Sequence, residues 1–158
     1  MLKRIIFAIL IIVNCMIIFN FSSQNSEKSN ETSSVIVDKV VDTIANANKN
    51  IEKDAIKDNV TVVVRKLAHF SIYTLLGIWL MNEANTFDIS KKKKYVICVL
   101  FGCLYAISDE FHQSFVSGRS QEIRDIVIDT CGVLFGCVLV IAVGMIIKKF
   151  MNKKGENV

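Results

Sequence analysis

The residues best suited to chemistry lie in two charged stretches, each attached to long apolar runs. The first stretch carries Arg65, Lys66 and His69 at the start of an apolar run. The second stretch, Ser108–Asp129, lies between two further apolar runs and contains carboxylates, arginines and Gln113. Charge within or beside a bilayer-spanning segment is costly, so such groups pair with one another or line a wet cavity. We therefore expect the two stretches to form one site.

Helical spacing places these residues on shared faces. In a helix, side chains four positions apart lie on the same side. The sets with this spacing are Arg65, His69 and Tyr73, then Asp109 and Gln113 with Glu110 beside them, and finally Asp125 and Asp129. At about 1.5 Å rise per residue, the three sets fall in the outer third of a bilayer core about 30 Å thick. Matching depth on three helices is what a common pocket requires.

Several kinds of chemistry remain open for such a pocket. His69 with Asp109 or Glu110 could act as an acid–base pair, because a carboxylate fixes the tautomer of an imidazole. Arg65 and Arg119, with the N-terminus of the last helix, could hold a phosphate or a carboxylate. The carboxylates that could hold Mg²⁺ beside such an anion are Asp109, Glu110, Asp125 and Asp129. A salt-bridge network that only orients the helices is the remaining alternative.

Composition places these residues in a membrane protein. The chain has 158 residues, of which 52% are hydrophobic, and the apolar residues come in long blocks. We predict an all-α integral membrane bundle of four transmembrane helices. The expected spans are 5–21, 61–81, 95 to about 116, and 126–147. As domains, we expect a first transmembrane helix (1–21), an extracytoplasmic amphipathic connector (22–60), a three-helix core (61–150) and a cytoplasmic tail (151–158).

The polar connector is expected to contain an amphipathic helix. Its apolar residues Val37, Val41 and Ile44 follow helical spacing, which indicates a segment lying on the membrane surface or over the site. Ser33 and Ser34 are the residues that we expect to cap its N-terminus. A loosely ordered connector is the alternative.

The positions of the basic residues predict the orientation of the chain in the membrane. The net charge is +4, but the basic residues lie at the ends of apolar blocks rather than beside aromatic residues on one face, which argues against nucleic acid as a partner. The basic groups that fall on one side are Lys3 with Arg4, Lys91–Lys94, and Lys148, Lys149, Lys153 and Lys154. By the positive-inside rule this side is cytoplasmic, so both termini are expected there.

Small residues predict close helix packing. Gly132 and Gly136 form a GxxxG pattern, and Gly102 and Ala106 are also four apart. We expect both pairs to pack within the bundle rather than to form a dimer. The five cysteines lie in apolar runs and form no CxxC pair, so we expect them to act as packing residues.

The chain resembles the VanZ-like family of bacterial membrane proteins. The resemblance lies in three blocks: FSSQ at Phe21–Gln24, RKLAHFSIYTLLG at Arg65–Gly77, and SDEFHQSFVSGRSQEIRDIVIDTCGVLFG at Ser108–Gly136. It implies a multi-pass, four-helix protein of the bacterial cell membrane. The founding member is associated with low-level resistance to the glycopeptide antibiotic teicoplanin, but the family name does not establish a reaction.

The resemblance falls on the same polar residues that spacing selects. We take His69, Asp109 and Glu110 as candidate catalytic residues. The candidate substrate-binding residues are Arg65, Lys66, Tyr73, Gln113, Arg119, Asp125 and Asp129. Three functions are open for this chain. It could be a cell-envelope protein that binds or alters an outer-leaflet target, an enzyme that acts on a phosphorylated lipid headgroup, or a structural or assembly protein. The expected partner in the first two cases is a membrane lipid or a lipid-linked envelope component.

Overall fold

Five helices make up the computed structural model, which describes residues 1–48, 52–119 and 122–155, with side chains up to residue 152. They are α1 (Leu2–Ser22), α2 (Ser26–Ala47), α3 (Lys53–Ala84), α4 (Lys91–Gln113) and α5 (Ile123–Gly155). Helices α1, α3, α4 and α5 are long and apolar enough to cross a membrane. The predicted all-α architecture with four candidate spans is confirmed, while the side chains of Lys153 and Lys154 lie outside the described residues.

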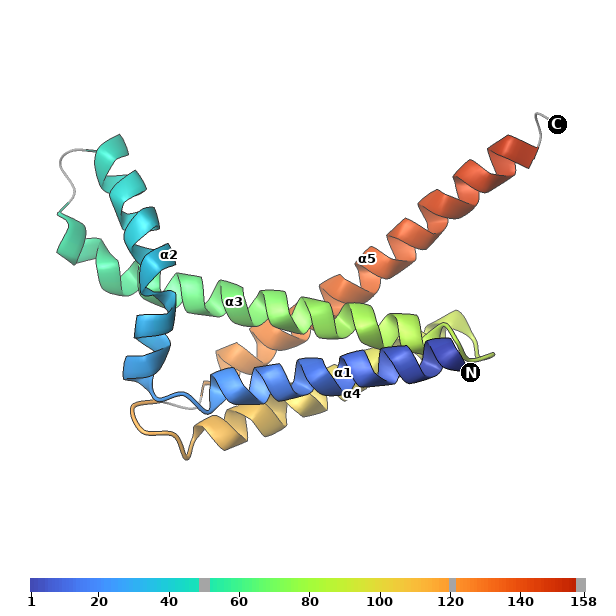
Figure 1. The fold of residues 1–158 in the computed structure, drawn as a ribbon, viewed down its shortest axis with the longest axis horizontal. Coiled ribbons are helices and arrows are strands. Elements are labelled where there is room, and N and C mark those ends of the chain that lie inside the picture. The colour runs from blue at the N-terminus through green and yellow to red at the C-terminus, as the bar shows by residue number, and fades with distance from the viewer. Residues whose placement is uncertain (49–51, 120–121, 156–158) are drawn as a thin grey trace.

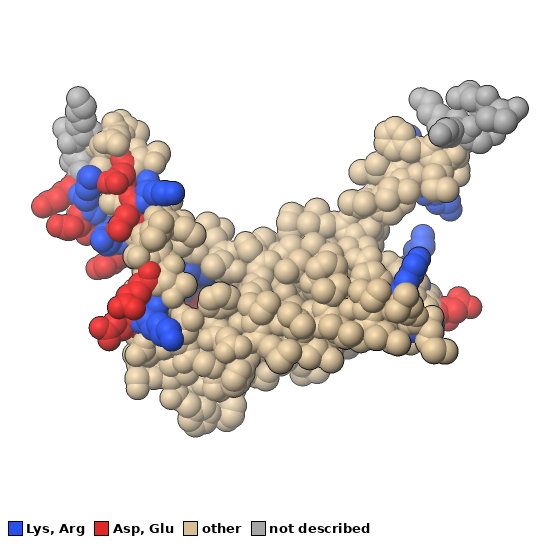
Figure 2. Space-filling model, viewed as in Figure 1, with Lys and Arg blue, Asp and Glu red and all other residues tan. Residues whose placement is uncertain are grey.

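The candidate spans are arranged around α3. Helices α1 and α4 run along it, α5 crosses it and continues beyond the bundle, and α2 projects from the end where α1 finishes (Figure 1). The N-terminus lies at the other end, where Arg4 Nη2 donates a hydrogen bond of 2.7 Å to the carbonyl of Thr86. On the face shown in Figure 2, charged side chains gather toward the two ends and are nearly absent from the middle. This distribution is the one that a bilayer core requires.

Helix α2 begins earlier than its apolar spacing predicts. Its N-cap is Asn25, whose side chain accepts a hydrogen bond of 2.9 Å from the backbone N–H of Lys28, so the predicted cap at Ser33 or Ser34 is wrong. Val37 and Val41 are buried where α2 packs on α3. Helix α3 begins at Lys53, well before the expected start of the second span, so the last part of the predicted connector is helical and continuous with that span.

The connection between α4 and α5 turns at a glycine. Helix α4 ends at Gln113 rather than near residue 116. Gly118 has φ +76°, a conformation that a residue with a side chain rarely adopts, so a glycine suits the turn at this position. The Ser26 hydroxyl donates a hydrogen bond of 2.9 Å to the Gly118 carbonyl, so this connection is attached to the start of α2.

Glycines allow α3 and α5 to pack at very short range. A Cβ at Gly132 would lie 2.6 Å from the carbonyl oxygen of Phe70, and one at Gly136 would collide with the carbonyl oxygen of Thr74. Gly77 on α3 faces the backbone of Val133 in the same way. The predicted packing role of the GxxxG pair within the bundle is therefore confirmed.

Replacing Gly136 with Ala should destabilise the bundle, because the added methyl group meets backbone atoms that cannot rotate away. We expect the free energy of unfolding to fall by about 1–3 kcal/mol, measured as a lower denaturation temperature in detergent. The matched control is Gly144→Ala, since a Cβ at Gly144 meets nothing within 4 Å. Equal stability of the two variants would contradict the packing assigned to the GxxxG pair.

Candidate functional site

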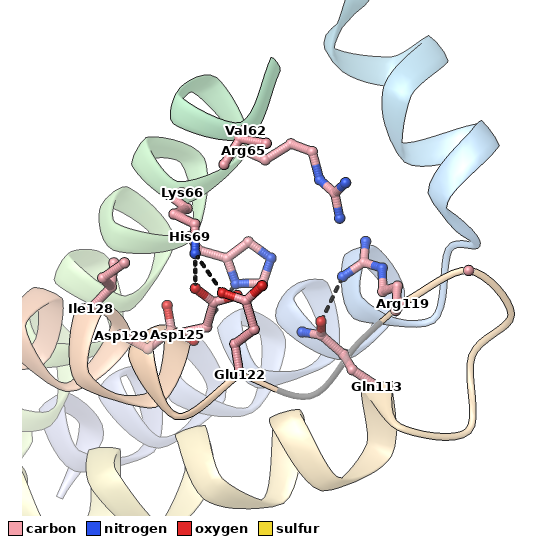
Figure 3. Close-up of a pocket in the computed structure, with 11 residues that line it drawn as sticks. Val62, Arg65, Lys66, His69, Gln113, Arg119, Glu122, Asp125, Ile128 and Asp129 are labelled. Carbon is pink, nitrogen blue, oxygen red and sulfur yellow. Dashed lines mark hydrogen bonds and ion pairs between the residues drawn. The ribbon is translucent and has the colours of Figure 1, made fainter. Parts of the chain in front are cut away.

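A polar cavity of about 140 Å³ lies between the first half of α3, the end of α4 and the start of α5. Figure 3 shows its charged side chains converging from these elements. The residues lining this polar cavity are Val62, Arg65, Lys66, His69, Gln113, Gly118, Arg119, Glu122, Asp125, Ile128 and Asp129. Most of the residues predicted to bind a substrate therefore lie around one space.

Polar side chains on α3 and α5 meet in successive pairs along the two helices. Lys66 Nζ makes ion pairs with Asp125 and, at 3.3 Å, with Glu122 Oε2. His69 Nδ1 lies 3.6 Å from Asp129 Oδ2. Glu122 belongs to the charged stretch but no spacing rule singled it out, because it precedes the helix that carries the other carboxylates. The charge of Lys66 is thus already matched by two carboxylates.

Asp109 joins α4 to α1 beneath the cavity. It is buried, and its Oδ2 accepts hydrogen bonds from Ser22 Oγ at 2.8 Å and from Gln113 Nε2 at 3.2 Å. The bond from Gln113 confirms that these two residues share a face of α4. Ser22 belongs to the FSSQ block, so that block held the signal, although spacing alone gave the serine no role.

Three of the predicted residues form a compact group. Possible ligand atoms of His69 on α3, Asp109 on α4 and Asp129 on α5 all lie within 4.8 Å of one another. Both carboxylates are buried, and Asp129 is 0% exposed. The structure therefore brings together the residues that were expected at matching depth.

Glu110 and Tyr73 are not members of this group, although the Tyr73 side chain lies close to the carboxylates of Asp109 and Asp129. Glu110 Oε2 accepts a hydrogen bond of 3.1 Å from the backbone N–H of Glu122, so Glu110 holds the start of α5 rather than facing His69. Among the described residues, no hydrogen-bond partner is present for the buried Tyr73 hydroxyl. The Tyr73 ring instead packs near Tyr105, with 6.3 Å between centroids.

Two arginines face one another at the rim of the polar cavity (Figure 3). Arg119 donates hydrogen bonds to Gln113 Oε1 at 2.8 Å and to the Phe21 carbonyl at 3.3 Å, both of which are neutral acceptors. Arg65 makes no hydrogen bond or ion pair with any described residue. Burial, and after it the charge of Arg65, lowers the pKa of Arg119 below its usual value. Neither guanidinium group forms an ion pair with a described carboxylate, although the charges of Asp109, Glu110 and Asp125 act on Arg119 from a greater distance.

A second cavity, of about 230 Å³, adjoins these arginines between α1, α2 and α3. We call it the apolar cavity, since its walls are mainly aliphatic and aromatic. Its apolar lining residues are Ile18, Phe21, Ile36, Val64, Ala68 and Ile72. Arg65, His69 and Arg119 line both cavities, so polar and apolar spaces meet at these three side chains.

Four candidate spans around a charged site define a multi-pass membrane protein. The chain belongs to the VanZ/LLP1 family, whose model matches residues 7–147. The matched segment includes every residue of the polar cavity, and it confirms the family resemblance. Comparison with curated proteins and with solved structures gives no match.

Replacing Ser22 with Ala should weaken the attachment of α1 to α4. The variant removes a buried hydroxyl that donates to a carboxylate, so we expect the free energy of unfolding to fall by about 2 kcal/mol. Thermal denaturation in detergent measures the change. Ser71→Ala is the matched control, because that serine is exposed and its hydroxyl donates only to the Leu67 carbonyl of its own helix. A Ser22 variant as stable as the Ser71 variant would contradict this role.

Proposed function

We propose that this VanZ/LLP1 protein binds a phosphate-bearing lipid of the bacterial cell envelope. The anionic head occupies the polar cavity, and the hydrocarbon chain enters the apolar cavity. The observation that carries the proposal is the pair of facing guanidinium groups, Arg65 and Arg119, for which no carboxylate partner exists among the described residues.

Electrostatics favours an anion at this pair. Two like charges in a partly buried space repel each other, and an anion between them replaces repulsion with attraction. Guanidinium groups bind phosphate oxygens through two parallel hydrogen bonds, which gives both affinity and orientation. Lys66 is already paired with Asp125 and Glu122, so its role is to hold α3 against α5 while the arginines contact the ligand.

The apolar cavity supports a lipid over a free phosphate. It adjoins Arg65 and Arg119, so a molecule with its head at the arginines has space for a chain beside Ile18 and Ile72. Apolar walls with a few convergent polar groups are typical of small-molecule sites. The combined shape therefore matches an amphiphile.

The distribution of lysines supports an outer-leaflet position. The predicted cytoplasmic groups Lys3, Arg4 and Lys91–Lys94 belong to the end of the bundle opposite the polar cavity (Figures 1 and 3). The site then faces the outer leaflet, with both termini inside the cell. Binding an envelope lipid there alters what an external glycopeptide such as teicoplanin meets, which connects the site to the resistance associated with the family's founding member.

Removing the arginine charges should weaken lipid retention. For the double variant Arg65→Gln with Arg119→Gln, we expect affinity for an anionic phospholipid to fall at least about tenfold, or about 1.4 kcal/mol. The measurement is native mass spectrometry of the protein in nanodiscs that contain phosphatidylglycerol, with phosphatidylcholine as the neutral comparison.

Arg124→Gln is the matched control, since it removes the same charge from a side chain that is 84% exposed and lies outside the cavity. Retention of phosphatidylglycerol by the double variant at the level of this control would overturn the proposal. Tight binding of inorganic phosphate with no preference for phosphatidylglycerol would overturn the lipid part of it. Expression of the native chain, but not of the double variant, should raise the teicoplanin concentration that inhibits growth.

Cysteine labelling tests the orientation. In a chain without its native cysteines, Lys28→Cys on α2 should react with a membrane-impermeant maleimide in intact cells. Lys92→Cys at the start of α4 should react only after the cells are permeabilised, because the positive-inside rule places this end in the cytoplasm. The opposite labelling pattern would show that the site faces the cytoplasmic leaflet.

A further inference from the structure

We infer that His69, Asp109 and Asp129 form a binding site for one divalent transition-metal cation. This site goes beyond the proposed lipid function and involves other side chains than the two arginines. Its three ligands come from α3, α4 and α5, so a bound cation would join three of the candidate spans at a single point.

The spacing of the three groups fits a metal ion. Zinc binds imidazole nitrogen and carboxylate oxygen at about 2.1 Å, which separates two ligand atoms on a tetrahedral ion by about 3.4 Å. His69 Nδ1 and Asp129 Oδ2 are 3.6 Å apart, close to this separation. The whole set lies within 4.8 Å, so rotation of a carboxylate closes the remaining distance.

The state of Asp129 is the second observation that points to a ligand. Its carboxylate is fully buried, and among the described residues neither oxygen accepts a hydrogen bond. A buried carboxylate without a hydrogen bond or a close positive charge is very costly, and a cation is one of the few partners that remove this cost. His69 Nδ1, which faces Asp129, is also without a hydrogen bond in the described part of the chain.

The donor set favours a transition metal over Mg²⁺. An imidazole nitrogen with carboxylate oxygens is suited to Zn²⁺ or Mn²⁺, whereas Mg²⁺ prefers oxygen ligands alone. The four-carboxylate set considered from the sequence does not come together, because Asp125 pairs with Lys66 and Glu110 accepts the N–H of Glu122. Two carboxylates and a neutral imidazole carry a charge that a divalent cation neutralises.

Asp109 already has the supporting bonds of a metal ligand. Ser22 and Gln113 both donate to its Oδ2, which fixes the carboxylate and leaves Oδ1 for a cation. Such supporting bonds orient metal-binding carboxylates in proteins. His69 and Asp129 also line the polar cavity, which gives an ion a path to the site and an open position for water or an anion.

A protonated His69 between the two carboxylates is the competing explanation. It also supplies positive charge, but it predicts no metal affinity. The experiment therefore measures metal directly. The full chain is purified in detergent through a tag that contains no histidine, treated with a chelator, and titrated with Zn²⁺ and separately with Mn²⁺. Bound metal is counted by mass spectrometry of the elements after gel filtration, and Co²⁺ absorption reports the ligand geometry.

We expect about one cation per native chain, with Zn²⁺ or Mn²⁺ retained in the presence of excess Mg²⁺. His69→Ala and Asp129→Asn should each lower the affinity by more than about a hundredfold, and Gln113→Leu by about 10–100-fold through the loss of its supporting bond. His112→Ala is the matched control. This second histidine stacks on Phe19 of α1 and lies outside the group.

Failure of the native chain to bind any of these cations would overturn the inference, as would equal affinity in the His69 and His112 variants. If Asp129→Asn does not fold, His69→Ala and Gln113→Leu decide the question alone. The double arginine variant should keep its cation while losing its lipid. Loss of metal binding and loss of lipid binding are therefore separate results, and each bears on its own proposal.

Discussion

The close contact between α3 and α5 is the constraint on which the rest of the structure depends. Glycines at 77, 132 and 136 let the two backbones approach until carbonyl oxygens lie where a side chain would otherwise stand. At this separation, side chains three residues apart on α3 meet side chains four residues apart on α5, so Lys66 reaches Asp125 and His69 reaches Asp129. The polar cavity forms where this ladder of pairs meets the α4–α5 connection. Which charged side chains meet therefore depends on the short distance between the α3 and α5 backbones that the glycines allow.

The balance of charge around the cavity argues against a purely structural network. A network that only orients helices would match each buried charge with a partner, because unmatched charge destabilises the folded state. Here the matching is uneven. Lys66 has two carboxylate partners, while Arg65 has no partner among the described residues and Arg119 has only neutral ones. Asp129 lies 3.6 Å from His69 Nδ1 but accepts no hydrogen bond from any described residue. A network that only orients helices does not account for groups matched as unevenly as these.

Much of the fold could be predicted from the sequence, because long apolar blocks and small-residue patterns can be recognised within a short continuous stretch of residues. The four candidate spans and the packing of Gly132 and Gly136 follow from these rules. The start of α2 could not be predicted from apolar spacing, since its first turns are polar and their only signal is the capping residue Asn25. In the site, helical spacing identified which residues share a face but not which neighbour each one meets. Glu110 turns to the backbone of Glu122, and Ser22 reaches Asp109 across 87 positions of the chain, contacts that depend on how helices cross.

Gly118 connects the wall of the polar cavity to the helix that lines the apolar cavity. Its carbonyl is held by Ser26 at the first residue of α2, and the next residue along the chain is Arg119, which stands at the junction of the two cavities. Helix α2 also supplies one wall of the apolar cavity. A displacement of α2 would therefore act, through the Ser26–Gly118 hydrogen bond, on the loop that carries this arginine. The width of the apolar cavity and the distance between the two guanidinium groups are thus expected to change together.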